Sequence, residues 1–146
     1  MYSEILVPTD GGTSSDIAIE HAVYLARQCD GRVHGLFVVD SGPLESVAGG
    51  YPEAVSEIER LGEDAVERVE EVGDEQGVET TTSVLRGTAH QTIAEYVDEN
   101  DIDAVVMGTH SREGVNRHLI GSVTERVIRA VDVPVVAVTD PLLDDE

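Results

Sequence analysis

Short apolar runs alternate with amphipathic segments along most of the chain, at the spacing expected when strands and helices follow one another. Five of these runs have the length and β-branched content of buried strands. They cover Glu4–Pro8, Val33–Val39, Val78–Leu85, Ala104–Met107 and Val133–Val138. The third run is the least apolar because Thr80–Ser83 are polar, so we expect it at an edge of the sheet.

Between neighbouring runs, apolar side chains recur at helical spacing. The four predicted helices begin near Thr13, Glu53, Thr88 and Ser122. Three of these starts have a Ser or Thr followed three residues later by an acid or amide, which predicts capping boxes. We expect these side chains on the core faces: Ala18, Ala22, Leu25 and Cys29; Val55, Ile58, Ala65, Val69 and Val72; Ile93, Ala94 and Val97; Val123, Val127, Ala130 and Val131.

The order of elements predicts an α/β fold built as one domain over residues 1–146. Right-handed crossovers between successive strands give an open five-stranded parallel sheet with helices on both faces. The expected strand order is 3-2-1-4-5. Residues 40–52 lack periodicity and are predicted to form a flexible loop, and residues 140–146 a loose acidic tail.

Ligands of such sheets bind beyond the carboxyl ends of the strands, where the strand order reverses. With the expected order, this point lies between the first and fourth strands. Their carboxyl ends are Thr9-Asp10 and Met107-Gly108. The search for a functional site therefore begins at these two pairs.

Charge separates this chain from an average domain, since 30 acidic residues outweigh 9 basic ones and the net charge is −21. All the basic residues are Arg. Such a charge repels itself strongly except in concentrated salt, so the composition predicts a salt-rich cytoplasm, as in halophilic archaea. It argues against a nucleic-acid partner. No membrane-length apolar run or signal peptide is expected, and the single cysteine, Cys29, indicates a cytoplasmic protein.

The segment from Gly108 to Ser122 is an island of donors in this acidic chain. It contains two arginines, Arg112 and Arg117, and two histidines, His110 and His118, but only one acidic residue, Glu113. It also leads into a predicted helix start, where free N–H groups and a partial positive charge favour phosphate. Gly121 would allow close approach, and the Ser122 hydroxyl can donate. The alternative is a surface loop in which Gly and Ser serve only as turn and cap.

The sequence at this loop resembles the signature of the universal stress protein family. The matching pattern is Gly108-x-x-Ser111, nine residues, then Gly121-Ser122. The resemblance extends to the opening strand, the second strand, the turn at Gly87-Thr88-Ala89, and the fourth and last strands. It implies an adenine nucleotide alpha hydrolase-like fold that binds ATP or AMP, possible bridging by Mg²⁺, and a homodimer formed through Val133–Val138.

The resemblance also implies a role for each matching position. Pro8, Thr9 and Asp10 would lie near ribose and adenine, the backbone of Val38 at the adenine edge, and Met107 and Gly108 at the floor. The phosphates would be held by His110, Ser111, Arg112, Gly121, Ser122, Val123 and Thr124.

Ser111 departs from the family pattern, which has glycine at this position. A serine there either adds a donor or hinders phosphate approach, so three functions stay open. They are a regulatory nucleotide-binding protein, a slow ATPase, and a nucleotide-free dimeric interaction module. No catalytic residues are proposed because no base that would activate water can be named. A chain without Lys is neither a Walker-type ATPase nor a phospho-receiver.

The remaining candidates for chemistry are expected to be structural. His110 and His118 lack the partners that a metal site needs, so no metal site is predicted. His21 and His34 fall in helix and strand patterns and are interpreted as packing residues. Cys29 lies on the predicted core face of its helix and is expected to be buried.

Overall fold

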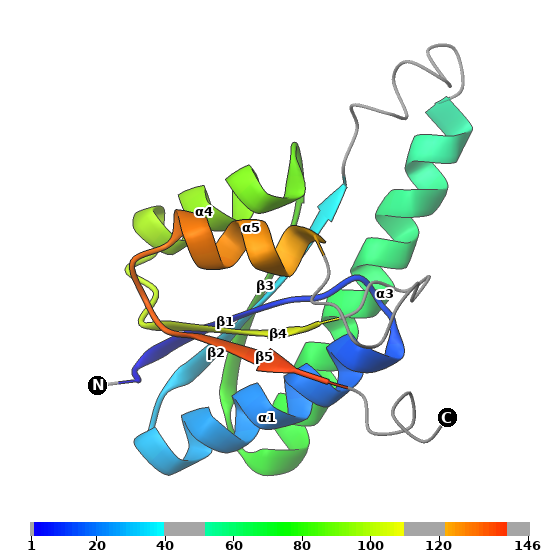
Figure 1. The fold of residues 1–146 in the computed structure, drawn as a ribbon. Helices are drawn as coiled ribbons and strands as arrows, with labels where there is room; N and C mark the ends of the chain where they lie inside the picture. Colours follow the sequence, from blue (N-terminus) through cyan, green and yellow to red (C-terminus); the bar gives the residue numbers. More distant parts are fainter. Residues whose placement is uncertain (1, 40–51, 110–121, 140–146) are drawn as a thin grey trace, which may run out of the picture.

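The computed structural model describes residues 2–39, 52–109 and 122–139. Five parallel strands form one sheet in the order β3-β2-β1-β4-β5, which confirms the predicted α/β fold and strand order (Figure 1). The strands are β1 (Glu4–Pro8), β2 (Arg32–Val39), β3 (Glu79–Arg86), β4 (Ala104–Gly108) and β5 (Val135–Val138). β3 lies at one edge of the sheet, as its polar centre predicts.

Helices cover both faces of the sheet, two on each (Figure 1). One face is covered by α1 (Thr13–Cys29) and α3 (Pro52–Gln76). The other face is covered by α4 (Ala89–Glu99) and α5 (Ser122–Ala130). None of the helices in the described part of the chain is both long and apolar enough to cross a membrane.

Alternation along the strands divides the core into two layers. Ile5 and Val7 of β1 are fully buried beneath α1 and α3, whereas Leu6 between them is fully buried beneath α4 and α5. Successive side chains of a strand point to opposite faces, so a strand buried on both sides reads as a continuous apolar run. The strands were predictable from sequence for this reason.

Gly35 of β2 sets how closely α3 approaches the sheet. A Cβ at this position would lie 2.8 Å from Cγ2 of Val69, a fully buried residue of α3. Protein cores are packed to crystal-like density, so an added methyl group cannot be absorbed without movement. Residue 35 is therefore glycine because of packing.

A buried polar chain links β1, β2 and α4. His34 is 5% exposed, and its Nδ1 lies 2.8 Å from the Tyr96 hydroxyl oxygen. Its Nε2 lies 2.7 Å from Oε1 of Glu4. Because the Glu4 carboxylate can only accept, Nε2 is the donor to it and Nδ1 accepts from the Tyr96 hydroxyl. Burial raises the pKa of the Tyr96 phenol. Both ring nitrogens of His34 are thus satisfied, which agrees with its interpretation as a packing residue.

Several local predictions are wrong. Cys29, Val123 and Ala130 were expected on the core faces of their helices, but all three are exposed, Val123 to 38%. His21 was expected to be a packing residue, and it is exposed as well. Cys29 is the last residue of α1, so the burial seen at Ala22 and Ala26 on the same face does not continue to it. The α5 residues belong to a short helix beside the edge strand β5, which offers little surface to cover them.

The capping boxes are also wrong in detail. Gly12 is the N-cap of α1, so Thr13 is already helical, and α5 likewise begins at Ser122. Thr88 is the N-cap of α4 as predicted, but its side chain makes no capping hydrogen bond. Residues 40–51, 110–121 and 140–146 lie outside the described residues, and with them the predicted loop and tail and the residues His110 and His118.

Candidate functional site

The carboxyl end of β1 turns into α1 through a short polar segment. The backbone N–H of Thr9 donates to the carbonyl oxygen of Leu36 at 2.9 Å, so residue 9 still continues the sheet. The chain then turns at Gly11, whose φ of +82° lies in the left-handed region that favours glycine. Thr9 and Asp10 are therefore held at the edge of the sheet where the fold predicts a ligand.

Asp10 is fixed by its own turn. Its Oδ1 accepts hydrogen bonds from the N–H of Gly12 at 2.8 Å and from Oγ of Ser15 at 2.9 Å. The N–H of Asp10 donates to Ser15 Oγ at 3.2 Å. Ser15 is buried in the first turn of α1. This mutual pairing orients the carboxylate over the start of α1, where it complements the helix dipole.

A second carboxylate lies close by on α1. Burial raises the pKa of Asp16 above its usual range, and the nearby carboxylates of Glu20 and Asp10 raise it further. Arg68 of α3 acts in the opposite direction and lowers it. The first turn of α1 therefore concentrates negative charge on the α3 side of this edge.

The carboxyl end of β4 is locked between α1 and α5. A Cβ on Gly108 would lie 2.6 Å from Cβ of Ser14 and 2.8 Å from its carbonyl carbon, so only glycine allows α1 to pack this closely. From the other side, Oγ1 of Thr124 donates to the carbonyl oxygen of Gly108 at 2.9 Å. Two helix N-termini are thus brought to the end of one strand (Figure 1).

Thr109, the residue that follows β4, has an unusual side chain. Its N–H donates to the carbonyl oxygen of Val138 at 2.9 Å, which continues the pairing with β5. The residue is 4% exposed, and its Oγ1 has no hydrogen-bond partner within the described part of the chain. A buried hydroxyl without a partner costs free energy, and in native structures it calls for an explanation such as a missing ligand or water. The Thr109 hydroxyl is therefore able to form a hydrogen bond with a ligand at the end of β4, where the fold predicts one.

Comparison with known proteins agrees with this geometry. The family model described as "Universal stress protein family" matches residues 1–139. The chain belongs to the universal stress protein family. The Methanocaldococcus jannaschii protein named Universal stress protein MJ0531 is 36% identical over 143 residues, which cover 97% of this chain and 84% of the relative.

Solved structures of the family share the fold. The structure of the hypothetical protein MJ0577 superposes with a TM-score of 0.85, covers 96% of this chain and 97% of that one, and is 26% identical. The universal stress protein from Archaeoglobus fulgidus in complex with dAMP has a TM-score of 0.69 and 22% identity, and covers 94% and 98% of the two chains.

Nine of the residues predicted for a universal stress protein site are described. The ends of β1 and β4 bring together Thr9, Asp10 and Gly108, with Thr124 bonded to Gly108. Ser122 and Val123 are exposed in the first turn of α5. The others are Pro8, Val38 and Met107. His110, Ser111, Arg112 and Gly121 lie outside the described residues.

Met107 is predicted to line the floor of the site. Its side chain is 5% exposed and packs in the core beneath α4 and α5. Val38 is half-buried on β2, two residues beyond the point where Pro8 of β1 pairs with Leu36. Val38 therefore extends past the end of β1, and its place beside adenine stays a prediction.

Three residues of this edge were missed. Ser14, Ser15 and Thr109 are each at least nine-tenths buried here. For Ser14 and Ser15 the signal in the sequence is the run of small polar residues in the first turn of α1, a pattern that is also typical of an ordinary helix start. No group of three side chains suited to a metal gathers within residues 2–39, 52–109 and 122–139.

Proposed function

We propose that this universal stress protein domain binds an adenine nucleotide between the ends of β1 and β4, with ATP as the first candidate and AMP as the alternative. The observation that carries the proposal is the meeting of two helix N-termini at Gly108, because free N–H groups at helix starts bind phosphate. The unused hydroxyl of Thr109 beside them adds to it.

Each part of the nucleotide has candidate partners in the chain. The fixed carboxylate of Asp10 suits a ribose hydroxyl, with Pro8, Thr9 and Val38 beside the base. The first turn of α5, Ser122–Thr124, would hold the phosphates together with Gly121 and residues 110–112. A Mg²⁺ ion held by phosphate oxygens would offset the negative charge that Asp10 and Asp16 place nearby. The related Archaeoglobus protein, which was solved with dAMP, supports the choice of adenine.

Nucleotide binding is tested by isothermal titration of the apo protein with ATP, AMP and GTP, each with Mg²⁺. We expect ATP or AMP to bind and GTP to bind at least tenfold more weakly, a difference of about 1.4 kcal/mol. Ser122→Ala and Gly121→Val should weaken the binding. Ser56→Ala is the matched control for Ser122→Ala, because it makes the same change at an exposed position of α3. Absence of adenine-nucleotide binding, or equal binding by the three variants, refutes the site.

The role we propose is regulatory, with little or no turnover. Nothing among the described residues identifies a base that would activate water, and Oδ1 of Asp10 already accepts from Gly12 and Ser15. Slow ATP hydrolysis is the alternative, and ADP release above the buffer rate would establish it. We also expect the protein to act in the cytoplasm, at high salt.

We further propose that two copies pair through β5. This strand ends the sheet formed by the described residues, and its Val136 is 43% exposed. The preceding helix α5 adds exposed apolar side chains at Val123 and Ile128. An apolar edge strand is a template for pairing with another chain. If nucleotide binding is absent, such a dimer could still act as an interaction module.

Sedimentation velocity tests the dimer. Val136→Arg should shift the protein to monomer, because it places like charges where two copies would meet. Leu61→Arg changes a side chain of similar exposure, 44%, on α3 and should leave the dimer intact. Because each copy carries a charge of −21, the dimer should strengthen as salt rises. A wild-type monomer at every salt concentration would overturn the proposal.

A further inference from the structure

The second edge of the sheet offers a surface that the nucleotide site does not use. β3 pairs with β2 along its whole length, and it ends the sheet formed by the described residues. An edge strand leaves a row of backbone N–H and C=O groups unpaired. Its six central residues, Thr80–Leu85, carry no charge. Proteins usually protect such edges with charged side chains, and here the protection is missing from the centre.

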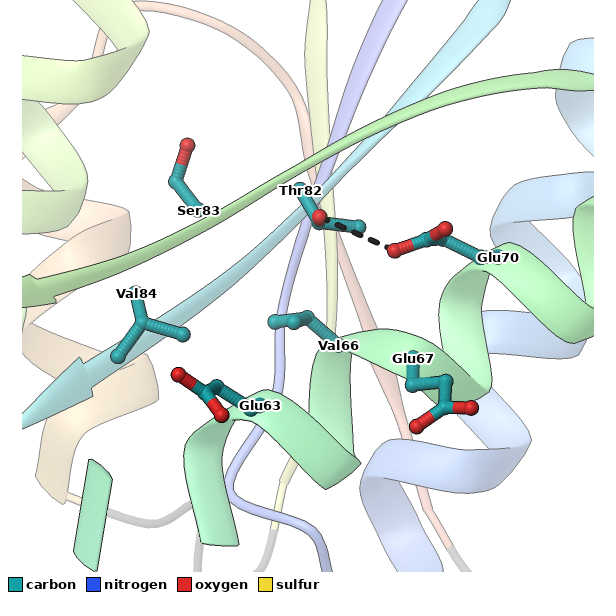
Figure 2. Close-up of a pocket in the computed structure, with 7 residues that line it drawn as sticks. All are labelled: Glu63, Val66, Glu67, Glu70, Thr82, Ser83 and Val84. Atoms are coloured by element: carbon teal, nitrogen blue, oxygen red, sulfur yellow. Dashed lines mark hydrogen bonds between the residues drawn. The ribbon is translucent and has the colours of Figure 1, made fainter. Parts of the chain in front are cut away.

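A groove lies along this edge, between β3 and α3. It has a volume of about 480 Å³ and opens to solvent. Figure 2 shows its walls: Glu63, Val66, Glu67 and Glu70 from α3, and Thr82, Ser83 and Val84 from β3. The floor is apolar at Val66, which is 5% exposed, and Val84 is half-buried beside it.

The helix runs alongside the strand in the opposite direction. Arg86 near the end of β3 pairs with Glu59, and Thr82 in the middle donates to Oε1 of Glu70 at 3.3 Å. Thr80 at the start of the strand lies against Gly73. The glutamates of the groove therefore form a row parallel to the open edge of β3.

The spacing of this row matches an extended chain. Glu63 and Glu67 are four residues apart, and at about 1.5 Å per residue they are separated by roughly 6 Å along the helix axis. Side chains on one face of an extended strand repeat every 6.5 Å or so, which is about the same distance. Neither Glu63 nor Glu67 has a salt bridge among the described residues.

We propose that this groove binds a basic, extended peptide segment of a partner protein, which adds to β3 as a sixth strand. The backbone of the segment pairs with the open edge of β3. Its Arg or Lys side chains, at every second position, face Glu63 and Glu67, and the aliphatic stems of these side chains rest on Val66 and Val84. A second copy of this chain is disfavoured at this edge, because it would bring the glutamates of the two grooves against each other.

The test uses a capped, fluorescent peptide of about nine residues, long enough to span the 8 residues of β3, that alternates arginine and valine. A second peptide has proline at its two central valines, which removes backbone donors but keeps the charge. Anisotropy is measured at about 0.5 M KCl, where long-range attraction to the acidic surface is largely screened. We expect the proline peptide to bind about tenfold more weakly, the loss expected from a few missing backbone hydrogen bonds.

Protein variants separate the groove from the general acidity of the surface. Glu63→Gln with Glu67→Gln should weaken the arginine peptide three- to tenfold, as expected for two partly exposed ion pairs. Glu57→Gln with Glu75→Gln removes the same charge from exposed positions of α3 outside the groove, and should change the affinity less than about twofold. Amide exchange of Thr80–Leu85 should slow when the arginine peptide binds.

Three results would overturn the proposal. The first is an equal affinity of the protein for the arginine-valine peptide and its proline version, because the peptides would then bind through their charge alone. The second is an equal loss in the groove and control variants. The third is a slowing of β3 amide exchange that increases with protein concentration in the absence of peptide. That result would mean that a second copy of the chain, rather than a peptide, pairs with β3. None of these measurements depends on nucleotide, so the outcome is independent of the proposed function.

Discussion

Gly108 offers the sharpest link between packing and the proposed nucleotide site. In Gly108→Ala the new Cβ would meet three atoms of Ser14, at 2.6 Å from Cβ, 2.8 Å from the carbonyl carbon and 3.0 Å from the carbonyl oxygen. Two of these atoms are backbone, so no side-chain rotation relieves the contact. The first turn of α1 has to move, and with it Ser15 and its hydrogen bonds to Asp10.

The magnitude follows from measured overpacking in cores, which costs about 1–3 kcal/mol per added group. For a domain of about 150 residues, each kcal/mol lowers the melting temperature by roughly 2–4 °C, so we expect a drop between about 2 and 12 °C. The affinity of the folded protein for ATP or AMP should fall at least tenfold, which corresponds to about 1.4 kcal/mol.

Gly35→Ala is the matched control. Its Cβ would meet Val69 at 2.8 to 3.2 Å, a contact of similar severity that involves α3 rather than α1. Both variants should therefore lose stability, measured by urea unfolding, whereas only Gly108→Ala should lose affinity. A second variant, Ser14→Gly with Gly108→Ala, removes the closest contact and should recover part of the loss. If folded Gly108→Ala binds nucleotide as wild type does, the coupling between α1 packing and the site is refuted.

Three further variants test the polar contacts that hold the sheet and α1. Asp103→Ala should cost roughly 1–3 kcal/mol in urea unfolding, because Oδ2 accepts from two backbone N–H groups at the start of β1, both at 2.9 Å, and Asp103→Asn should cost less. Tyr96→Phe should cost about 1 kcal/mol, since it leaves Nδ1 of His34 without its donor in the core. Asp16→Asn should stabilise the protein at neutral pH. The folded-state pKa of Asp16 is raised, so the carboxyl favours folding only while protonated, and the advantage of the variant should vanish when unfolding is followed toward pH 3.

Much of the fold could be predicted because buried parallel strands are apolar on both faces. The runs at Ile5–Val7 and Val105–Met107 are buried at every position, so they are visible in the sequence without any alternation. Helix faces were less predictable where the sheet ends. Val127 is fully buried, but Val123 and Ile128 on the same helix are exposed, because α5 lies beside an edge strand. Local pattern carries no information on how far the sheet extends beneath a helix.

The candidate site divides in the same way. The alternation of strands and helices along the chain was enough to place Thr9, Asp10 and Gly108 at one edge of the sheet. In a parallel sheet the carboxyl ends of all strands lie at the same edge. The hydrogen bonds between Asp10 and Ser15 and the buried hydroxyl of Thr109 could not be predicted, because short polar residues after a strand are as common in plain turns as in sites. These details depend on the approach of α1 to β4, which is a tertiary property.

That approach also changes how the first glycine of the loop signature is understood. A glycine before a phosphate loop is usually explained by the room that it gives to the ligand. At Gly108 the atoms that a Cβ would meet belong to Ser14 of the protein itself, so the glycine is needed before any ligand arrives. Because the same contact brings the N-terminus of α1 to the end of β4, it serves the fold and the site together. Gly108 can therefore contribute to the proposed site through the packing of α1, and the comparison of Gly108→Ala with Gly35→Ala tests this contribution.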